Sequence, residues 1–312
     1  MHELPGWIVL WQCLAAMLKV FAHAALALPC IAALTLLAGR REKSRLCAFG
    51  SREMALLSLP LAFVWPLLLI SDVLLLFALT QGPVRLPENF SPGMPAMLPY
   101  SSALVAWLTG VLCLCVQLWR SRPHASPATL SPENRQPHMS AGLCLASALC
   151  FFAALALPVC PLAGLPEGLT ASQAALAVMS STLHVYFTCF APAGALALSA
   201  LALRPGLMQT WACPQEDEAL AARWCALWAM IGYIPYCLDR WGVCLGFALR
   251  PGSMPPVISL RVPSLVAISL AVMCWGILFF RRAPRKIYWL NTLGLLLLSL
   301  GLCLPFASAL WR

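Results

Sequence analysis

The chain alternates long apolar runs with short polar segments. The apolar runs cover residues 7–38, 54–80, 98–119, 141–164, 172–203, 222–249, 264–281 and 287–311. Each run holds about 18 to 30 residues, enough for a helix to cross a hydrocarbon core of roughly 30 Å. Because a helix satisfies its own backbone hydrogen bonds in lipid, the pattern predicts an all-α integral membrane protein with eight transmembrane helices.

The composition supports a membrane protein and excludes several soluble classes. Of the 312 residues, 61% are hydrophobic and 10% are charged, against roughly 45–50% and 25% in soluble domains. No soluble fold hides that much apolar surface from water, which excludes a soluble enzyme, a nucleic-acid-binding module and a disordered scaffold. We therefore expect the lipid bilayer as a partner and no nucleic acid, despite the net charge of +9.

The basic residues predict an orientation in the membrane. The segments after predicted helices one, three, five and seven hold 14 Lys and Arg residues, and the opposite side holds five. Because Lys and Arg are enriched in cytoplasmic loops, the odd-numbered loops are predicted to lie in the cytoplasm. Both termini then lie outside, which is the periplasmic side of a bacterial inner membrane.

Most of the 15 cysteines, Cys13 and Cys303 among them, fall inside apolar runs. In that setting a thiol behaves as a small hydrophobic group, so we expect these cysteines to act in packing. No C-x-x-C or C-x-x-C-H spacing occurs. The sequence therefore predicts no covalently attached c-type haem and no iron–sulfur or zinc site in this chain.

The chain resembles itself at a fixed distance. A shift of 161 residues without gaps superposes residues 103–123 on residues 264–284. The same shift places His23 of predicted helix one on His184 of predicted helix five, and these are the only histidines inside predicted spans. Two independent matches at one offset indicate an internal duplication.

The duplication divides the chain into two domains, residues 1–164 and residues 165–312, each with four helices. An even number of crossings gives both halves the same orientation, related by a pseudo-twofold axis along the membrane normal. The alternative is that helices rich in Leu and Ala resemble one another by composition alone. Asp72 and Asp239 add to the case for a repeat, since each lies near the predicted outer end of its helix after a proline.

The two intramembrane histidines are candidate haem ligands. A neutral imidazole supplies an axial ligand to iron, and helix bundles commonly hold cofactors. Entering from outside, His184 lies about 13 residues or roughly 20 Å along its helix, and Met273 about 10 residues or roughly 15 Å along helix seven. These similar depths predict that His184 and Met273 share one low-spin haem iron. The counterpart of Met273 is Leu112, so His23 would ligate a second haem without an equivalent partner.

Other residues are candidates for holding the haem. Lys19 lies one turn from His23 on the same helical face, and either Lys19 or Arg240 could pair with a haem propionate. The alternatives are a lysine that extends toward the interface and an arginine that contacts water and headgroups. Five aromatic residues could line the macrocycle or simply pack between helices: Trp228, Tyr233, Tyr236, Trp241 and Trp275.

This pattern resembles subunit I of the cytochrome bd quinol oxidases. The resemblance rests on an outside N-terminus, two four-helix halves, and the segments AHAALALP with His23, TLHVYF with His184 and AVMCWG with Met273. It implies a low-spin haem b held by His184 and Met273 and a high-spin haem b ligated by His23.

The chain also departs from that family. Predicted helix three, residues 98–119, contains no acidic residue, whereas the family has glutamates there that serve oxygen reduction. The outer segment 250–262 is short where the family has the long loop of its quinol site. We therefore expect a haem b subunit, an oxidoreductase subunit by electron transfer, that is not an oxygen reductase.

Such a subunit would pass electrons between the quinone pool and a redox partner at the outer face. The partner would be another subunit of a membrane complex, such as a multihaem cytochrome c or an iron–sulfur protein. Two alternatives come from other classes. One is a polytopic transporter or channel whose histidines relay protons, and the other is a membrane anchor subunit without cofactors.

Overall fold

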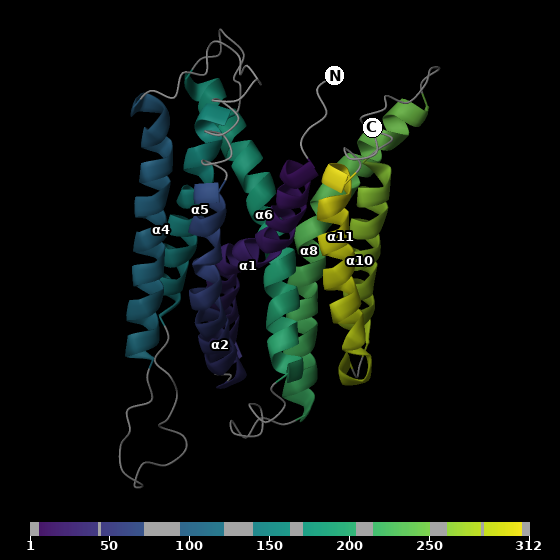
Figure 1. The fold of residues 1–312 in the computed structure, drawn as a ribbon. Helices are drawn as coiled ribbons and strands as arrows, with labels where there is room; N and C mark the ends of the chain where they lie inside the picture. Colours follow the sequence, from purple (N-terminus) through teal and green to yellow (C-terminus); the bar gives the residue numbers. More distant parts are fainter. Residues whose placement is uncertain are drawn as a thin grey trace. The chain divides into compact units, whose positions relative to one another are not determined.

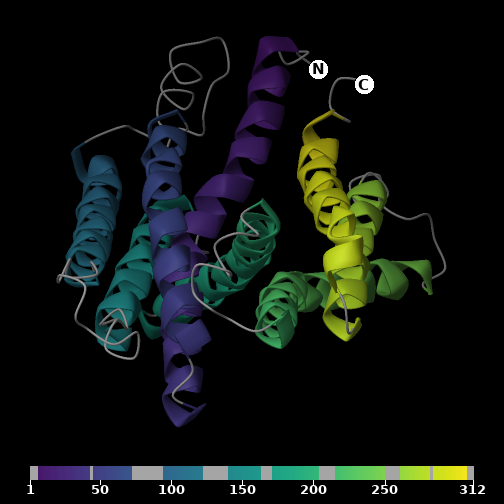
Figure 2. The ribbon, with the colours of Figure 1, turned by 90° about the horizontal axis from the view of Figure 1, so that it is seen from below.

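A computed structural model describes residues 6–42, 45–71, 94–121, 140–162, 171–203, 215–249, 261–281 and 284–307. Figures 1 and 2 show the chain in two views. The elements follow in the order α1 (Gly6–Glu42), α2 (Arg45–Ala62), α4 (Met94–Arg120), α5 (Ala141–Leu162), α6 (Ala171–Leu203), α8 (Gln215–Ala248), α10 (Val262–Phe280), the 3-10 helix η2 (Pro284–Ile287) and α11 (Trp289–Ala307). No strand occurs in these ranges, which confirms the all-helical prediction there.

Five stretches of the described helices are long and apolar enough to cross a membrane. They are Leu10–Ala38, Gly50–Ser71, Tyr100–Arg120, Val178–Leu203 and Val262–Phe280. Helices α5 and α11 contain shorter apolar stretches, Ala141–Leu157 and Trp289–Pro305. Helix α8 is 34 residues long and carries Asp239 and Arg240. The described part of the chain is thus a helical protein with the character of a multi-pass membrane protein.

The chain forms two compact units. The first unit comprises residues 25–186, and the second unit comprises residues 1–24 together with residues 187–312. The chain passes from one unit to the other inside α1, after Ala24, and again inside α6, after Tyr186. The sequence halves 1–164 and 165–312 therefore do not coincide with the compact units, because the first helix of each half contributes to both.

Hydrogen bonds and one aromatic contact link the helices of the first unit in a ring. Each bond runs from a side chain to a backbone carbonyl of another helix: Ser58 of α2 to Ala25 of α1 (2.8 Å), Trp107 of α4 to Ala62 of α2 (3.0 Å), Ser147 of α5 to Gly110 of α4 (2.9 Å) and Tyr186 of α6 to Leu26 of α1 (3.4 Å). The ring of Tyr186 also meets Phe152 of α5 edge to face at 5.2 Å. In lipid, such hydrogen bonds and close packing hold helices together, because the apolar side chains gain little by leaving the tails.

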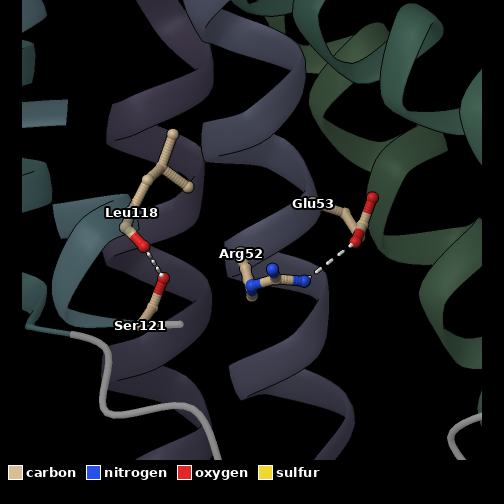
Figure 3. Close-up of polar contacts among 4 residues, drawn as sticks. All are labelled: Arg52, Glu53, Leu118 and Ser121. Carbon is tan, nitrogen blue, oxygen red and sulfur yellow. Dashed lines mark hydrogen bonds and ion pairs between the residues drawn. The ribbon is translucent and has the colours of Figure 1, made fainter. Parts of the chain in front are cut away.

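One end of the first unit carries polar contacts within single helices (Figure 3). The Ser121 hydroxyl donates to the Leu118 carbonyl at 3.0 Å where α4 ends. On α2, the guanidinium of Arg52 lies 3.7 Å from the carboxylate of Glu53. Arg52 is one of the basic residues from which the sequence predicts a cytoplasmic position for this end of the first unit. The carboxylate of Glu53 partly balances the charge of Arg52.

Small residues bring α6 and α8 close together in the second unit. A Cβ built on Gly194 would lie 2.5 Å from the backbone nitrogen of Ala229, and one on Gly232 would meet the backbone of Ala191. Only glycine permits this approach, as in the small-residue contacts typical of membrane helices. The interface between α6 and α8 is therefore closed by backbone contact.

Asn291 of α11 connects three helices of the second unit. Its side-chain nitrogen donates to the Ala195 carbonyl and the Ser199 hydroxyl of α6, both at 2.9 Å. Its side-chain oxygen accepts from Nε1 of Trp275 on α10 at 3.0 Å. Asn291 is 3% exposed and Trp275 fully buried. The amide is thus satisfied by protein groups in a position that lipid and water do not reach.

Candidate functional site

His23 and Lys19 lie on one face of α1, in the second unit. Their spacing of four residues places them one turn apart along the helix. Both side chains are half-buried, whereas Ala22 and Ala24 beside His23 are fully buried. Because ionisable side chains in a span are costly and normally face protein or a water-filled space, this pair is a candidate functional position.

His184 lies in α6, in the part that belongs to the first unit. Its side chain is half-buried. The same segment is anchored two residues later by Tyr186, whose hydroxyl donates to the Leu26 carbonyl of α1. Helix α6 therefore holds His184 beside a fixed contact between α6 and α1.

The two histidines occupy corresponding places relative to the units. His23 lies two residues before Ala25, where α1 enters the first unit, and His184 lies three residues before Phe187, where α6 enters the second. Each helix also has an interior proline beyond this point, Pro29 in α1 and Pro192 in α6. Each histidine thus lies within three residues of the position at which its helix passes from one unit to the other.

Met273 lies on the outer side of α10. Its side chain is 62% exposed, whereas Cys274 and Trp275, the next two residues, are buried. The structure does not direct Met273 into the core of the second unit, to which it belongs. Since His184 belongs to the first unit, the pairing of His184 with Met273 stays a prediction.

Arg240 has protein partners on its own helix. Its Nε lies 3.5 Å from a carboxylate oxygen of Asp239, and its guanidinium lies over the ring of Tyr236, 5.7 Å from the centroid. The side chains of Arg240 and Asp239 are 43% and 55% exposed. A role for Arg240 with a haem propionate stays a prediction, and Asp72 lies outside the described residues.

The aromatic residues predicted to line a macrocycle have packing partners within the second unit. Trp228 stacks on Phe190 at 5.3 Å, Tyr233 meets Tyr236 edge to face at 5.7 Å, Trp241 donates to the Ser269 hydroxyl at 3.0 Å, and Trp275 donates to Asn291. The indole N–H groups of Trp241 and Trp275 are therefore used in hydrogen bonds between helices. Trp228 and Tyr233 pack beside α6, between helices whose backbones already touch.

Sequence reasoning missed the buried polar network around Asn291. The available signal was an amide inside the predicted span 287–311, as unusual there as a histidine. It also treated Cys13 and Cys303 as separate packing residues, although the structure brings them together from the two ends of the chain. No sequence pattern links two residues that are 290 positions apart.

Within the described ranges, no group of three or more His, Cys, Asp or Glu side chains gathers to hold a metal ion. A haem needs only one or two protein ligands, so this finding does not bear on haem binding. Comparison of the chain with protein-family models, curated proteins and solved structures gives no match. The function is therefore argued from the residues of this chain alone.

Proposed function

We propose that this protein is a membrane-embedded haem b subunit of a respiratory electron-transfer complex, resembling subunit I of the cytochrome bd quinol oxidases. The observation that carries the proposal is the placement of His23 and His184. Both are half-buried in long apolar helices, and both lie beside the point where their helix passes between the compact units. Ionisable residues at matching intramembrane positions are candidate cofactor ligands in a helix bundle.

The proposal includes two tandem four-helix repeats, which the burial of α4 and α10 supports. On α4, residues 103, 107, 110, 114 and 117 are buried. At an offset of 161, the corresponding residues 264, 268, 271, 275 and 278 of α10 are buried as well. On the exposed side, Leu112 and its counterpart Met273 are 63% and 62% exposed. The two helices thus present corresponding faces to their units.

The packing of the following helix supports the repeat independently. Helices α5 and α11 align at an offset of 147, which places Pro158 on Pro305. In the first unit, Ser147 of α5 contacts Gly110 of α4. The offset of 147 moves position 147 to position 294 of α11, and the offset of 161 moves position 110 to position 271 of α10. The observed contact of the other helix pair, Ser264 to Gly301, lies seven residues away on each helix in opposite directions. Seven residues are about two turns, so both antiparallel pairs have the same register.

The residues fit a haem only in part. The imidazoles of His184 and His23 would each hold an iron, and Lys19 would bind a propionate of the haem at His23. A bound haem b supplies reversible one-electron exchange. The closed interface between α6 and α8 excludes a macrocycle there, since a Cβ on Gly194 already meets backbone. The exposed position of Met273 does not fit a ligand within its own unit.

The absence of an acidic residue in predicted helix three argues against oxygen reduction. We therefore assign electron transfer between the quinone pool and an outer-face redox partner, such as a multihaem cytochrome c or an iron–sulfur subunit. This chain would supply the membrane path, and its partner would supply the soluble redox centre. The assignment makes the chain an oxidoreductase subunit of the bacterial inner membrane, with both termini on the outer side.

The test is a dithionite-reduced minus oxidised visible spectrum of the purified protein, with a pyridine haemochrome to count haem b per chain. We expect one or two haems b. His184→Ala should remove the low-spin band and His23→Ala a separate high-spin contribution, because each loses its imidazole ligand. His124→Ala, a histidine in a predicted loop, is the matched control and should leave the spectrum unchanged. A colourless protein that elutes as a folded species would refute the proposal.

A transporter or channel is the second candidate, and one observation favours it. Helices α1 and α6 run from one unit into the other, with an interior proline and an ionisable residue near each crossing. Ionisable residues inside membrane helices commonly mark ion pathways and proton relays. For this candidate, His184→Ala would abolish proton-coupled flux in vesicles, and the protein would carry no haem band.

A further inference from the structure

Cys13 and Cys303 face each other in the second unit, one from the first helix and one from the last. The Cys303 thiol lies 3.3 Å from the Cys13 carbonyl, and the Cys13 thiol lies 4.0 Å from the Cys303 carbonyl. Both are free thiols in this structure. Each sulfur therefore lies against the backbone of the other cysteine, so the two side chains extend toward each other's helix.

This juxtaposition is particular to the second unit. Under the two repeat offsets, the counterparts of Cys13 and Cys303 are Ala174 and Ala156. The two ends of the chain thus carry a thiol pair that the duplicated architecture alone does not require.

Both cysteines lie near helix ends that the basic residues place on the outer side. Cys13 is seven residues after Gly6, or about 10 Å along α1, and Cys303 is four residues before Ala307, or about 6 Å from the end of α11. Cys303 is buried, and Cys13 is half-buried. The outer compartment of a bacterium is oxidising and favours disulfides over thiols.

We propose that Cys13 and Cys303 form a disulfide that ties the first half of α1 to α11. The two thiols lose two protons and two electrons as the S–S bond forms. The oxidant is a disulfide of a thiol oxidoreductase in the outer compartment, which is reduced to two thiols by exchange. The bond fixes the segment that carries Lys19 and His23 within the second unit. This inference rests on the proposed outer position of both termini and does not depend on a haem.

The experiment cuts the chain between its two cysteines. A protease site is placed in the segment 204–214, the protein is trapped with N-ethylmaleimide in the membrane, and the cut protein is run on denaturing gels with and without reductant. We expect one full-length band without reductant and two fragments with it. Cys13→Ser and Cys303→Ser should each give two fragments without reductant, whereas Cys274→Ser, a buried cysteine of α10, should behave as the parent.

Two outcomes overturn the proposal. One is a parent protein that separates into two fragments without reductant, both as isolated and after treatment with oxidised glutathione. The other is a link that persists in Cys13→Ser and in Cys303→Ser, which would place the bond elsewhere. Mass spectrometry of the trapped parent protein gives a second readout that needs no variant, because the peptides of Cys13 and Cys303 should appear joined.

Discussion

Asn291→Ala tests whether the buried amide network stabilises the second unit. The substitution removes two donated hydrogen bonds and one accepted from Trp275. At about 0.6 kcal/mol for each bond in a membrane bundle, the loss is about 2 kcal/mol. The emptied space beside the fully buried Trp275 adds about 1 kcal/mol. We expect a total loss of about 3 kcal/mol in the free energy of unfolding.

The assay is unfolding in mixed detergent micelles at rising dodecyl sulfate, followed by far-ultraviolet circular dichroism. Ser199→Ala removes only one of the bonds to Asn291, so it should cost about 1 kcal/mol or less. Thr109→Ala is the matched control, because the exposed Thr109 hydroxyl donates to the Val105 carbonyl of its own helix, and it should stay within about 0.5 kcal/mol of the parent. The reasoning is refuted if Asn291→Ala costs no more than Ser199→Ala.

Three further predictions concern the ligands, the packing and the orientation. Met273→Leu should lower the midpoint potential or convert the haem of His184 to high spin in the reduced spectrum, and an unchanged low-spin spectrum would disprove the His/Met assignment. Gly232→Leu should cost about 1–3 kcal/mol in the same unfolding assay, because its Cβ meets the Ala191 backbone. Gly242→Leu, with open space at its Cβ, should be neutral, and equal effects would argue against the α6 and α8 contact. Alkaline phosphatase fused after Arg312 should be active and a fused green fluorescent protein dark; the reverse would invert the predicted orientation.

The positions of the helices could be predicted because the bilayer imposes length and polarity together. Each described α-helix overlaps a predicted apolar run, whereas the charged end of α1 and the charged starts of α2 and α8 lie outside the runs, and η2 meets its run only at Ile287. Five stretches meet the length and hydropathy of a membrane span in the described residues. Hydropathy alone does not decide the remaining crossings, since α8 mixes aromatic, glycine and charged residues along its 34 positions.

The candidate site was only partly predictable. His23 and His184 could be found because histidine inside a span is rare and costly. The sequence could not predict which side of α10 carries Met273, because a methionine in an apolar helix has the same sequence context whether its side chain faces protein or lipid. The pairing of Cys13 with Cys303 depends on how the first and last helices meet, which local sequence does not encode.

Helices α1 and α6 each pass from one compact unit to the other, so the proposed repeats and the compact units have different boundaries. Each unit contains part of α1 and part of α6, because both helices are divided between the two units. The chain leaves one unit after Ala24 and the other after Tyr186, and these two positions are 162 residues apart. This spacing is close to the 161-residue offset that aligns His23 with His184. The first helices of the two proposed repeats therefore pass between units at corresponding positions. The two intramembrane histidines thus lie within three residues of the positions at which the chain passes from one unit to the other.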